Sequence, residues 1–353
     1  MGTNSWSVRL LFLSPFPSQP LYGGGVVRNH YLCRSLAQKH EVWASFCGLD
    51  GSPEFAGEIP LRGEGFPALF DPLFLYRAGR AIKRNRIEHI VCASLISGLH
   101  GALLKILTGR PLWMDEHNVE WHCSRRYGFR FWWLVYLLEW FVTRMADQVT
   151  CVSEEDRERF VAHFGLSPSK VFVAPNGVDY PLLSGTPSLP RTRNYRRVLF
   201  FGVLNYPPNR AAVEFLAEKV APMLSDDVEV VVAGKGGDDL PERYPRLTFL
   251  GFVDDIHLLV KECDGVVVPI FSGGGTRMKI LETLACGRPV VSTEVGAEGI
   301  DQSVTGEALS IVESAEEMVS WIDALPIGGE AEVPDAFREL YDWSTIWQNR
   351  APL

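Results

Sequence analysis

The sequence lacks the patterns that mark several common protein classes. Its seven cysteines form no C-x-x-C pair and have no regular spacing, which argues against a zinc-binding or disulfide-rich protein. Neither the P-loop pattern G-x-x-x-x-G-K-[ST] nor the dinucleotide pattern G-x-G-x-x-G occurs. The absence of any D-x-D pair weakens the case for a metal ion that clamps a diphosphate. We therefore expect reduced cysteines, no cofactor and no bound metal.

Positive charge is also scarce. The net charge is −9, from 34 basic and 43 acidic residues, and nucleic-acid binders usually carry a basic field instead. We therefore expect no nucleic-acid partner. The first apolar run, VRLLFLS at 8–14, is too short to span a bilayer, and no basic region or small-residue cleavage site marks a signal peptide. We expect a cytoplasmic protein.

The most apolar long stretch is FRFWWLVYLLEWFVTRMA at 129–146. Arg130, Glu139 and Arg144 interrupt it, so we do not expect it to cross a membrane. The pattern favours a long, largely buried helix. The alternative is a helix whose aromatic face rests on a membrane surface, with arginines flanking it. In that case the segment 125–146 makes a peripheral contact with the inner face of the membrane.

Short apolar runs alternate with helix-length segments along the chain, as in EVWASFC, HIVCASL, RVLFFG and GVVVPI. Near-continuous apolar runs indicate parallel strands that helices cover on both faces. The alternation breaks at PLLSGTPSLPRTRN, which has three prolines and is typical of a linker. We expect one α/β domain at 1–182, a linker at 183–194 and a second α/β domain at 195–333. A closing helix at 334–353 should pack back toward the first domain.

Three consecutive glycines precede a predicted helix in FSGGGTRMKILETLACGRPVVS, at 271–292. Glycine lets the backbone approach a ligand closely, and a helix N-terminus adds partial positive charge. Arg277 and Lys279 add full charges, so the segment suits a phosphate. Glu282 follows Gly275 by about 10 Å of helix, a distance that fits a ribose diol bound to its carboxylate. The alternative is an ordinary turn with a solvated glutamate.

A second glycine run, LYGGGVVRNHYL at 21–32, repeats this layout in the first half. One glycine turn in each domain indicates a diphosphate held between them, although a flexible surface loop is the alternative. In WMDEHNVEWHC, His117 follows a predicted buried strand and should face a ligand, unless it bonds to a local carbonyl. A metal site of the H-E-x-x-H kind is not supported, because His117 and His122 are five residues apart rather than four.

Two further strand ends carry glycine in the second half. Gly202 ends the strand in FFGVLNYPPNR, where the missing side chain would let a ligand approach. Phe252 and Val253, in LTFLGFVDDI, offer an apolar slot for a nucleotide base. The alternative for both segments is an ordinary strand-loop-helix connection that binds no ligand.

Together these segments resemble glycosyltransferase family 4, and the likeness covers nearly the whole chain. The resemblance rests on the GGG turn at 23–25 and on DEHNVE, VTCVSEEDRERF, VAPNGVD, FFGVLNYPPN, LGFVDD and GGGTRMKILETLACGRPVVST, of which the last is the most specific. It implies an α/β protein with the GT-B architecture: two facing Rossmann-like domains with parallel sheets and an interdomain cleft.

The resemblance also implies a function. Such enzymes transfer a sugar from a nucleotide-diphosphate sugar to an acceptor with retention of anomeric configuration, and they need no metal. We expect a hexosyltransferase-like enzyme that acts on a saccharide or lipid-linked saccharide in the synthesis of cell-surface polysaccharide or glycoconjugate. Alternatives on the same fold are a nucleotide-sugar epimerase and a non-catalytic nucleotide-sugar-binding relative.

Site residues carry over by position. His117 matches the histidine near the reacting sugar, and Glu282 matches the glutamate that holds the donor ribose. Arg277 and Lys279 complete the expected catalytic set with His117. The other donor-binding residues implied by the resemblance are Gly24, Gly25, Gly202, Phe252, Val253, Gly274, Gly275 and Thr276.

The sequence departs from the family pattern at two places. Gly274 stands where many members have a glutamate that contacts the donor sugar, which leaves the non-catalytic alternative open. Many members also have an arginine and a lysine after the first strand of the second domain, where this chain has no basic residue before Arg210. Our hypothesis is that Arg277 and Lys279, together with Arg210, supply the missing charge.

Overall fold

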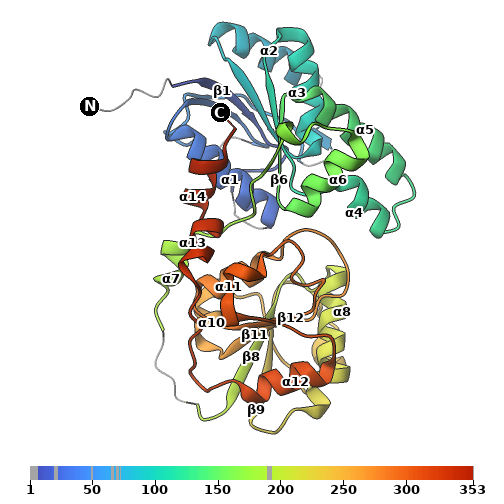
Figure 1. The fold of residues 1–353 in the computed structure, drawn as a ribbon, viewed down its shortest axis with the longest axis vertical. Coiled ribbons are helices and arrows are strands. Elements are labelled where there is room, and N and C mark those ends of the chain that lie inside the picture. The colour runs from blue at the N-terminus through green and yellow to red at the C-terminus, as the bar shows by residue number, and fades with distance from the viewer. Residues whose placement is uncertain are drawn as a thin grey trace. The chain divides into compact units, whose positions relative to one another are not determined.

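The computed structural model describes residues 7–19, 23–48, 51–64, 67–68, 71, 73–188 and 193–352. By its internal contacts the chain divides into two compact units (Figure 1). The first comprises Met1–Asn176 and Trp343–Leu353, and the second comprises Gly177–Asp342. Residues 189–192 of the expected linker lie outside the described residues.

The first unit is built on a seven-stranded parallel sheet in the order β3-β2-β1-β4-β5-β6-β7. The inner strand β1 runs from Arg9 to Leu13, and its last four residues are buried because helices cover both faces of the sheet. The other strands are β2 (Glu41–Ser45), β3 (Gly57–Glu58), β4 (His89–Ala93), β5 (Leu112–Asp115), β6 (Gln148–Cys151) and β7 (Val171–Val173).

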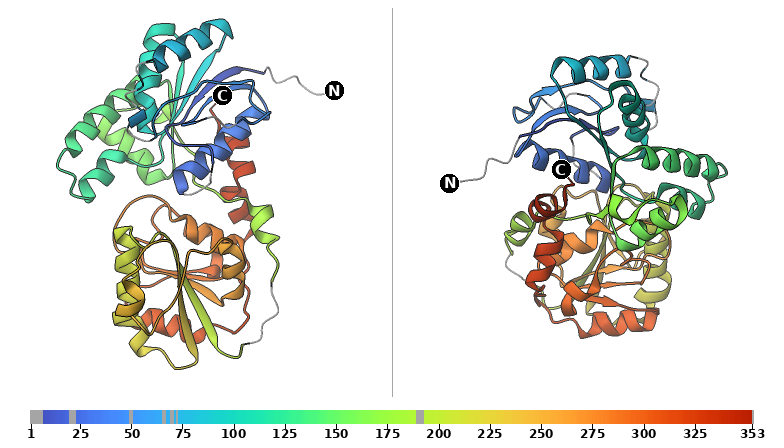
Figure 2. Two further views of the ribbon diagram at one scale, coloured as in Figure 1. Left: turned by 180° about the vertical axis from the view of Figure 1, so that it is seen from behind. Right: turned by 45° about the horizontal axis from the view of Figure 1, so that its top comes forward.

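Helices α2 (Phe74–Arg84), α3 (Leu95–Thr108) and α5 (Trp132–Met145) are neighbours in one layer of this unit. Helix α1 (Gly24–Ala37) packs against α14 (Trp343–Arg350), so the C-terminal segment completes the first unit. Figure 2 shows helices on both sides of each sheet. The remaining helices are α4 (Glu120–Arg126) and α6 (Glu154–Phe164).

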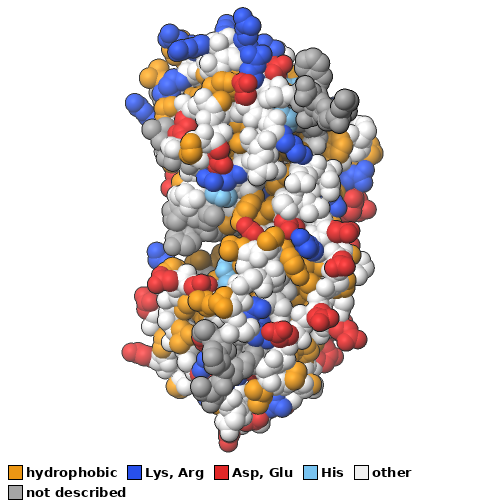
Figure 3. Space-filling view, turned by 90° about the vertical axis from the view of Figure 1, so that its left-hand side faces the viewer, with side chains coloured by type: hydrophobic (Ala, Val, Ile, Leu, Met, Phe, Trp, Pro, Cys, Tyr) orange, Lys and Arg blue, Asp and Glu red, His pale blue; other side chains and the backbone are white. Residues whose placement is uncertain are grey.

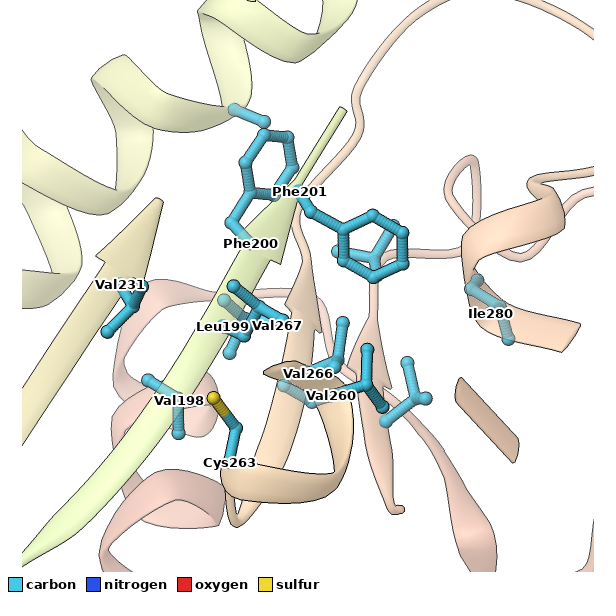
Figure 4. Close-up of a cluster of buried hydrophobic side chains, with 14 of the residues drawn as sticks. Val198, Leu199, Phe200, Phe201, Val231, Val260, Cys263, Val266, Val267 and Ile280 are labelled. Carbon is cyan, nitrogen blue, oxygen red and sulfur yellow. The ribbon is translucent and has the colours of Figure 1, made fainter. Parts of the chain in front are cut away.

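The second unit is built on a six-stranded parallel sheet in the order β10-β9-β8-β11-β12-β13. Valine, leucine and phenylalanine side chains of β8 and β11 pack with Cys263 in its core (Figure 4). Its strands are β8 (Arg196–Phe201), β9 (Val228–Ala233), β10 (Thr248–Gly251), β11 (Gly265–Val268), β12 (Val290–Ser292) and β13 (Leu309–Ile311). Its helices are α7 (Tyr180–Ser184), α8 (Pro207–Phe215), α9 (Leu240–Arg243), α10 (Ile256–Glu262), α11 (Met278–Ala285), α12 (Ala315–Ala324) and α13 (Asp335–Tyr341).

The closing segment forms two helices rather than one. Pro334 immediately precedes α13, which belongs to the second unit and packs Phe337 and Tyr341 into its core. The helix breaks at Asp342, and α14 then belongs to the first unit.

Helix α5 corrects the expectation of a largely buried helix. Its only buried residues are Glu139, Val142 and Thr143, whereas four large apolar side chains are 40–51% exposed: Trp133, Leu134, Leu137 and Trp140. Glu139 is buried because its carboxylate accepts hydrogen bonds from the backbone N–H groups of Glu120 and Trp121, at 2.8 and 2.9 Å, where α4 begins. Apolar composition predicted burial here, but the structure buries the charged Glu139 through two hydrogen bonds to the start of α4 and leaves four large apolar side chains exposed.

Across the part of the chain that the structure describes, no helix combines the length and hydropathy needed to cross a bilayer.

Candidate functional site

In the first unit, the strand order reverses between β1 and β4. Parallel α/β sheets bind ligands at the carboxyl ends of strands beside such a reversal. The chain enters α1 there through Gly23, at φ 90°, and Gly24 is the first residue of the helix. A Cβ atom on Gly25 would lie 3.1 Å from Nδ1 of His117 and 3.7 Å from the ring of Phe16. The structure thus brings the predicted glycines and His117 together.

His117 lies beside a buried carboxylate. Its Nε2 is 3.5 Å from Oδ2 of Asp115, and its side chain is 10% exposed. Within the described residues this nitrogen makes no hydrogen bond. The alternative of a histidine bonded to a local loop carbonyl through Nε2 therefore finds no support in the structure.

Asp115 forms an ion pair with Arg28, a residue that was not predicted to be part of the site. The guanidinium of Arg28 donates two hydrogen bonds to the Asp115 carboxylate, from Nε at 2.8 Å and from Nη2 at 2.7 Å. The hydroxyl of Thr150 donates a third, at 2.6 Å. Both partners of the Arg28–Asp115 pair are fully buried. Burial disfavours the charged carboxylate, but Arg28 outweighs it and holds the pKa of Asp115 well below its usual range. Asp115 thus stays ionised and positions its neighbours.

Arg28 connects α1 to distant parts of the unit. Its Nη1 donates to the carbonyl of Pro175 and to Oδ1 of Asn176, both at 3.2 Å. Its guanidinium also lies 4.9 Å from the ring centroid of Trp347 on α14. Trp347 stacks parallel to Trp343, at 6.3 Å between ring centroids. The C-terminal helix is therefore part of the cluster that supports His117.

In the second unit, the strand order reverses between β8 and β11. Gly202 follows β8, and a Cβ atom there would lie 2.8 Å from Nδ2 of Asn209 and 3.0 Å from Nζ of Lys279. A Cβ atom on Gly234, which follows β9, would lie 1.7 Å from the carbonyl oxygen of Gly202. Only glycine fits at Gly234, and this lets the ends of β8 and β9 come close together.

Lys279 lies directly beside these strand ends. Its Nζ donates to Oδ1 of Asn209 at 3.0 Å and lies 4.3 Å from the ring centroid of Phe200. Burial, followed by the nearby charge of Arg277, lowers the pKa of Lys279 to about 7, although Glu282 opposes the shift. Asn209 had not been predicted, because its partner is 70 residues further along the chain.

The glycine loop leads into α11, which begins at Met278. Arg277 folds back onto the loop: its Nη1 donates to the carbonyls of Gly274 and Gly275, the latter at 2.9 Å. Arg277 thus fixes the shape of the loop, and its predicted contact with a diphosphate stays a prediction. The Thr276 hydroxyl is buried and has no hydrogen-bond partner among the residues that the structure places.

Glu282 lies one turn after Lys279 on α11, and its Oε2 is 3.9 Å from Nε2 of His257 on α10. Burial raises the pKa of Glu282, while His257 and Lys279 act in the opposite direction. His257 had not been predicted. A carboxylate held at the first turns of α11 is suitably placed to accept hydrogen bonds from a diol.

The remaining predicted residues have different surroundings. Phe252 follows Gly251 and is 56% exposed, while Val253 packs partly against the core of the unit. Arg210 pairs with Asp239, at 3.0 Å for Nη1, and its Nε lies 3.5 Å from Glu214. These two acids already compensate the charge that we expected Arg210 to direct at a diphosphate.

The described ranges contain no group of three or more histidine, cysteine, aspartate or glutamate side chains that could hold a metal ion. The seven cysteines are free thiols, and five of them are buried.

Comparison with known families assigns both halves of the chain. Residues 22–180 match the family described as Glycosyltransferase Family 4, and residues 195–325 match the family described as Glycosyl transferases group 1.

Curated relatives of the chain include enzymes from Escherichia coli. The O-antigen biosynthesis glycosyltransferase WbnH is 22% identical over 271 residues, which cover 76% of this chain and 75% of the relative. The UDP-Gal:alpha-D-GlcNAc-diphosphoundecaprenol alpha-1,3-galactosyltransferase is 24% identical over 261 residues, which cover 67% of this chain and 65% of the relative.

Solved structures share the fold. The crystal structure of Anabaena HepE in complex with UDP and glucose superposes with a TM-score of 0.71, at 19% identity, over 97% of each chain. The sucrose-phosphate synthase of Thermosynechococcus elongatus superposes with a TM-score of 0.74, at 17% identity, again over 97% of each chain. This architecture is the GT-B fold.

The buried Arg28–Asp115 pair generates a stability prediction. Arg28→Met leaves a buried carboxylate without its counter-charge, so we expect the free energy of unfolding to fall by roughly 3–5 kcal/mol. Urea denaturation followed by tryptophan fluorescence measures the change. The double variant Arg28→Met/Asp115→Asn should recover much of the loss, because no charge then remains unpaired. Equal stability of the wild type and Arg28→Met would contradict this role.

Proposed function

The chain belongs to glycosyltransferase family 4 and has the GT-B fold, and from this premise we propose that it is a retaining, metal-independent, hexosyltransferase-like enzyme. It transfers a sugar from a nucleotide-diphosphate sugar to a saccharide or lipid-linked saccharide acceptor. Its relatives that act in O-antigen synthesis and on a diphosphoundecaprenol-linked sugar support a role in building cell-surface polysaccharide or glycoconjugate.

The observation that carries the donor assignment is the group of polar atoms at the strand reversal of the second unit. Lys279 and Asn209 lie beside Gly202, and the Thr276 hydroxyl, which has no hydrogen-bond partner within the described residues, precedes α11. A cationic amine, a free hydroxyl and a glycine loop that exposes backbone N–H groups together suit a diphosphate. Glu282 then binds the ribose. UDP in a structural neighbour of the same fold supports this use of the site.

The chemistry follows from charge development. As the bond between the anomeric carbon and the diphosphate breaks, the leaving group gains negative charge. Lys279, the loop N–H groups and the first turn of α11 stabilise that charge because the fold already holds them in place. Proton gain restores full charge to Lys279 as the anion arrives. The acceptor hydroxyl attacks from the face that the diphosphate leaves and gives its proton to the departing diphosphate, while His117 orients and polarises the reacting groups.

The pKa of Lys279 gives this assignment a pH signature. The amine of Lys279 has a pKa of about 7 without ligand, and a bound diphosphate should raise this pKa. At pH 8 the protein should therefore take up a proton when it binds UDP. Affinity for UDP should therefore decrease as the pH rises above about 7. Calorimetry of UDP binding in buffers of different ionisation enthalpy measures the uptake. Lys279→Arg should bind UDP without uptake, because arginine stays charged throughout. Binding heats of the wild type that do not depend on the buffer would reject the diphosphate contact.

His117→Ala tests the catalytic part of the proposal. We expect turnover to fall roughly 100- to 1,000-fold, the usual effect of removing a group that stabilises the transition state, while the melting temperature stays unchanged. Release of nucleoside diphosphate is measured with and without acceptor, in the presence of EDTA. His122→Ala is the matched control and should keep wild-type turnover. Full activity of His117→Ala, or loss of wild-type activity in EDTA, would each remove one element of the proposal.

We also propose that the segment 125–146 contacts the inner face of the membrane. Exposed rings and leucines project from α5, and the guanidiniums of Arg125, Arg130 and Arg144 lie 5.3–5.6 Å from ring centroids within the same segment. In the same layer, α3 lies between α5 and α2, and the stretch 74–86 that contains α2 has five basic residues and no acidic one. Lys and Arg side chains gather at the end of the first unit that carries α2 (Figure 3). Apolar anchors beside positive charge suit anionic lipid.

Vesicle flotation tests this contact. Wild-type protein should float with vesicles that contain phosphatidylglycerol, and Trp133→Ser/Leu137→Ser should not, because two of its largest exposed anchors are gone. Met223→Ser/Ile327→Ser, a matched pair of exposed apolar residues in the second unit, should float like the wild type. Wild-type protein that stays in the soluble fraction would contradict the membrane contact.

A further inference from the structure

A cavity of about 790 Å³ in the first unit adjoins His117 and Gly25, and most of its lining lies outside the residues assigned to the donor. Its volume lies in the upper part of the range for small-molecule sites. The ends of β4 and β5 contribute polar groups, which include Ser94, His117 and Asn118. The segment 129–138 contributes only apolar side chains, which include Phe131 and Leu138.

Ser94 is the unusual residue of this lining. Its backbone has φ 78° and ψ 156°, a region that glycine adopts freely and that strains other residues. Ser94 is 7% exposed, and its hydroxyl oxygen is buried without a hydrogen-bond partner in the described part of the chain. It does not cap α3, although it immediately precedes that helix. A glycine would adopt this conformation without strain, so a buried serine hydroxyl that has no partner among the described residues indicates a ligand.

The apolar part of the lining continues onto the exposed surface. Phe129, Phe131 and Leu134 line the cavity and are also 46–49% exposed, so the cavity opens along this segment. A free saccharide could stack on the phenylalanine rings, but it would leave Leu134, Val135 and Leu138 without a suitable partner, since these side chains offer neither hydrogen bonds nor an aromatic face. An alkyl or polyprenyl chain would bury them, and its other end would reach the polar groups at the strand ends.

We propose that this cavity binds the acceptor and that the acceptor is an amphiphile. Its hydroxyl-bearing head contacts Ser94 and His117, and its apolar chain lies along 129–138. This inference rests on the proposed transfer reaction and specifies the acceptor class and a residue that binds it. The surface contact of 125–146 with lipid and the cavity are continuous, so such an acceptor enters from the membrane side.

The first test measures binding without any transfer step. Methyl, hexyl and octyl glucosides are titrated below their critical micelle concentrations, in the absence of vesicles. We expect affinity to rise with chain length, by up to about fourfold for each methylene that is buried. Ile96→Thr, within the cavity, should reduce this dependence, whereas the surface variant Trp133→Ser/Leu137→Ser should retain it. Affinities that do not change with chain length would overturn the assignment of an amphiphile.

The second test isolates Ser94. Ser94→Gly removes the hydroxyl and relieves the backbone, so we expect an equal or higher melting temperature together with roughly tenfold weaker glucoside binding. UDP binding should not change. The matched control is Ser97→Ala, whose hydroxyl donates to backbone carbonyls at 2.7 and 3.1 Å; it should lower stability and leave glucoside affinity intact. Unchanged glucoside affinity in Ser94→Gly would overturn the role of Ser94.

Transfer is then assayed separately with the glucosides that bind. If they bind with the predicted dependence on chain length but receive no sugar from any nucleotide sugar, the transferase proposal fails while the cavity assignment stands. If sugar is transferred equally well to methyl and octyl glucosides, the cavity assignment fails while the transferase proposal stands.

Discussion

The buried ion pair between Arg28 and Asp115 is the interaction on which the first unit depends. It joins the helix that follows the glycine turn to the strand that leads to His117. Through its other contacts, Arg28 also holds the end of the unit at Asn176 and the tryptophan face of α14. A buried pair of this kind costs desolvation, and complete hydrogen bonding offsets that cost. The geometry around His117 is therefore set by groups from four distant segments of the chain.

In the second unit, a basic side chain is also held in place by residues that are distant in the sequence. Where many family members have basic residues after the first strand of this domain, the chain places Lys279 from α11 against the end of β8. Burial, together with the nearby charge of Arg277, lowers the pKa of this amine to about 7. Arg277 instead donates a hydrogen bond to a carbonyl of the glycine loop and fixes the shape of that loop. The structure thus places a lysine from a neighbouring element at a strand end where the sequence has no nearby basic residue.

Much of the fold could be predicted because buried parallel strands are short and almost entirely apolar. Both glycine turns could be recognised for a similar reason, since few other residues tolerate close backbone approach. The prediction that α5 is largely buried was wrong, because apolar content shows that a helix surface is hydrophobic but not whether another element covers it. In the structure Glu139 faces inward to cap α4, and Trp133 faces outward.

The rest of the site depends on contacts that no local pattern contains. Asn209 meets Lys279, and His257 approaches Glu282, only because parallel strands end at the same edge of a sheet. The strain at Ser94 is a property of backbone geometry, and the letters ASLISG give no sign of it. Positions of glycine can be predicted from sequence, whereas a serine in a glycine-like conformation becomes visible only in the folded chain.

The central claim is that a nucleoside diphosphate binds at the strand reversal of the second unit. Hydrogen–deuterium exchange with UDP, GDP, dTDP and ADP in turn tests it directly. The account predicts that one of them slows exchange in 202–209 and 272–282, with little change in 94–96. If none of the four slows exchange in the glycine loop, or if the slowing falls on 94–96 instead, the donor site has been placed wrongly.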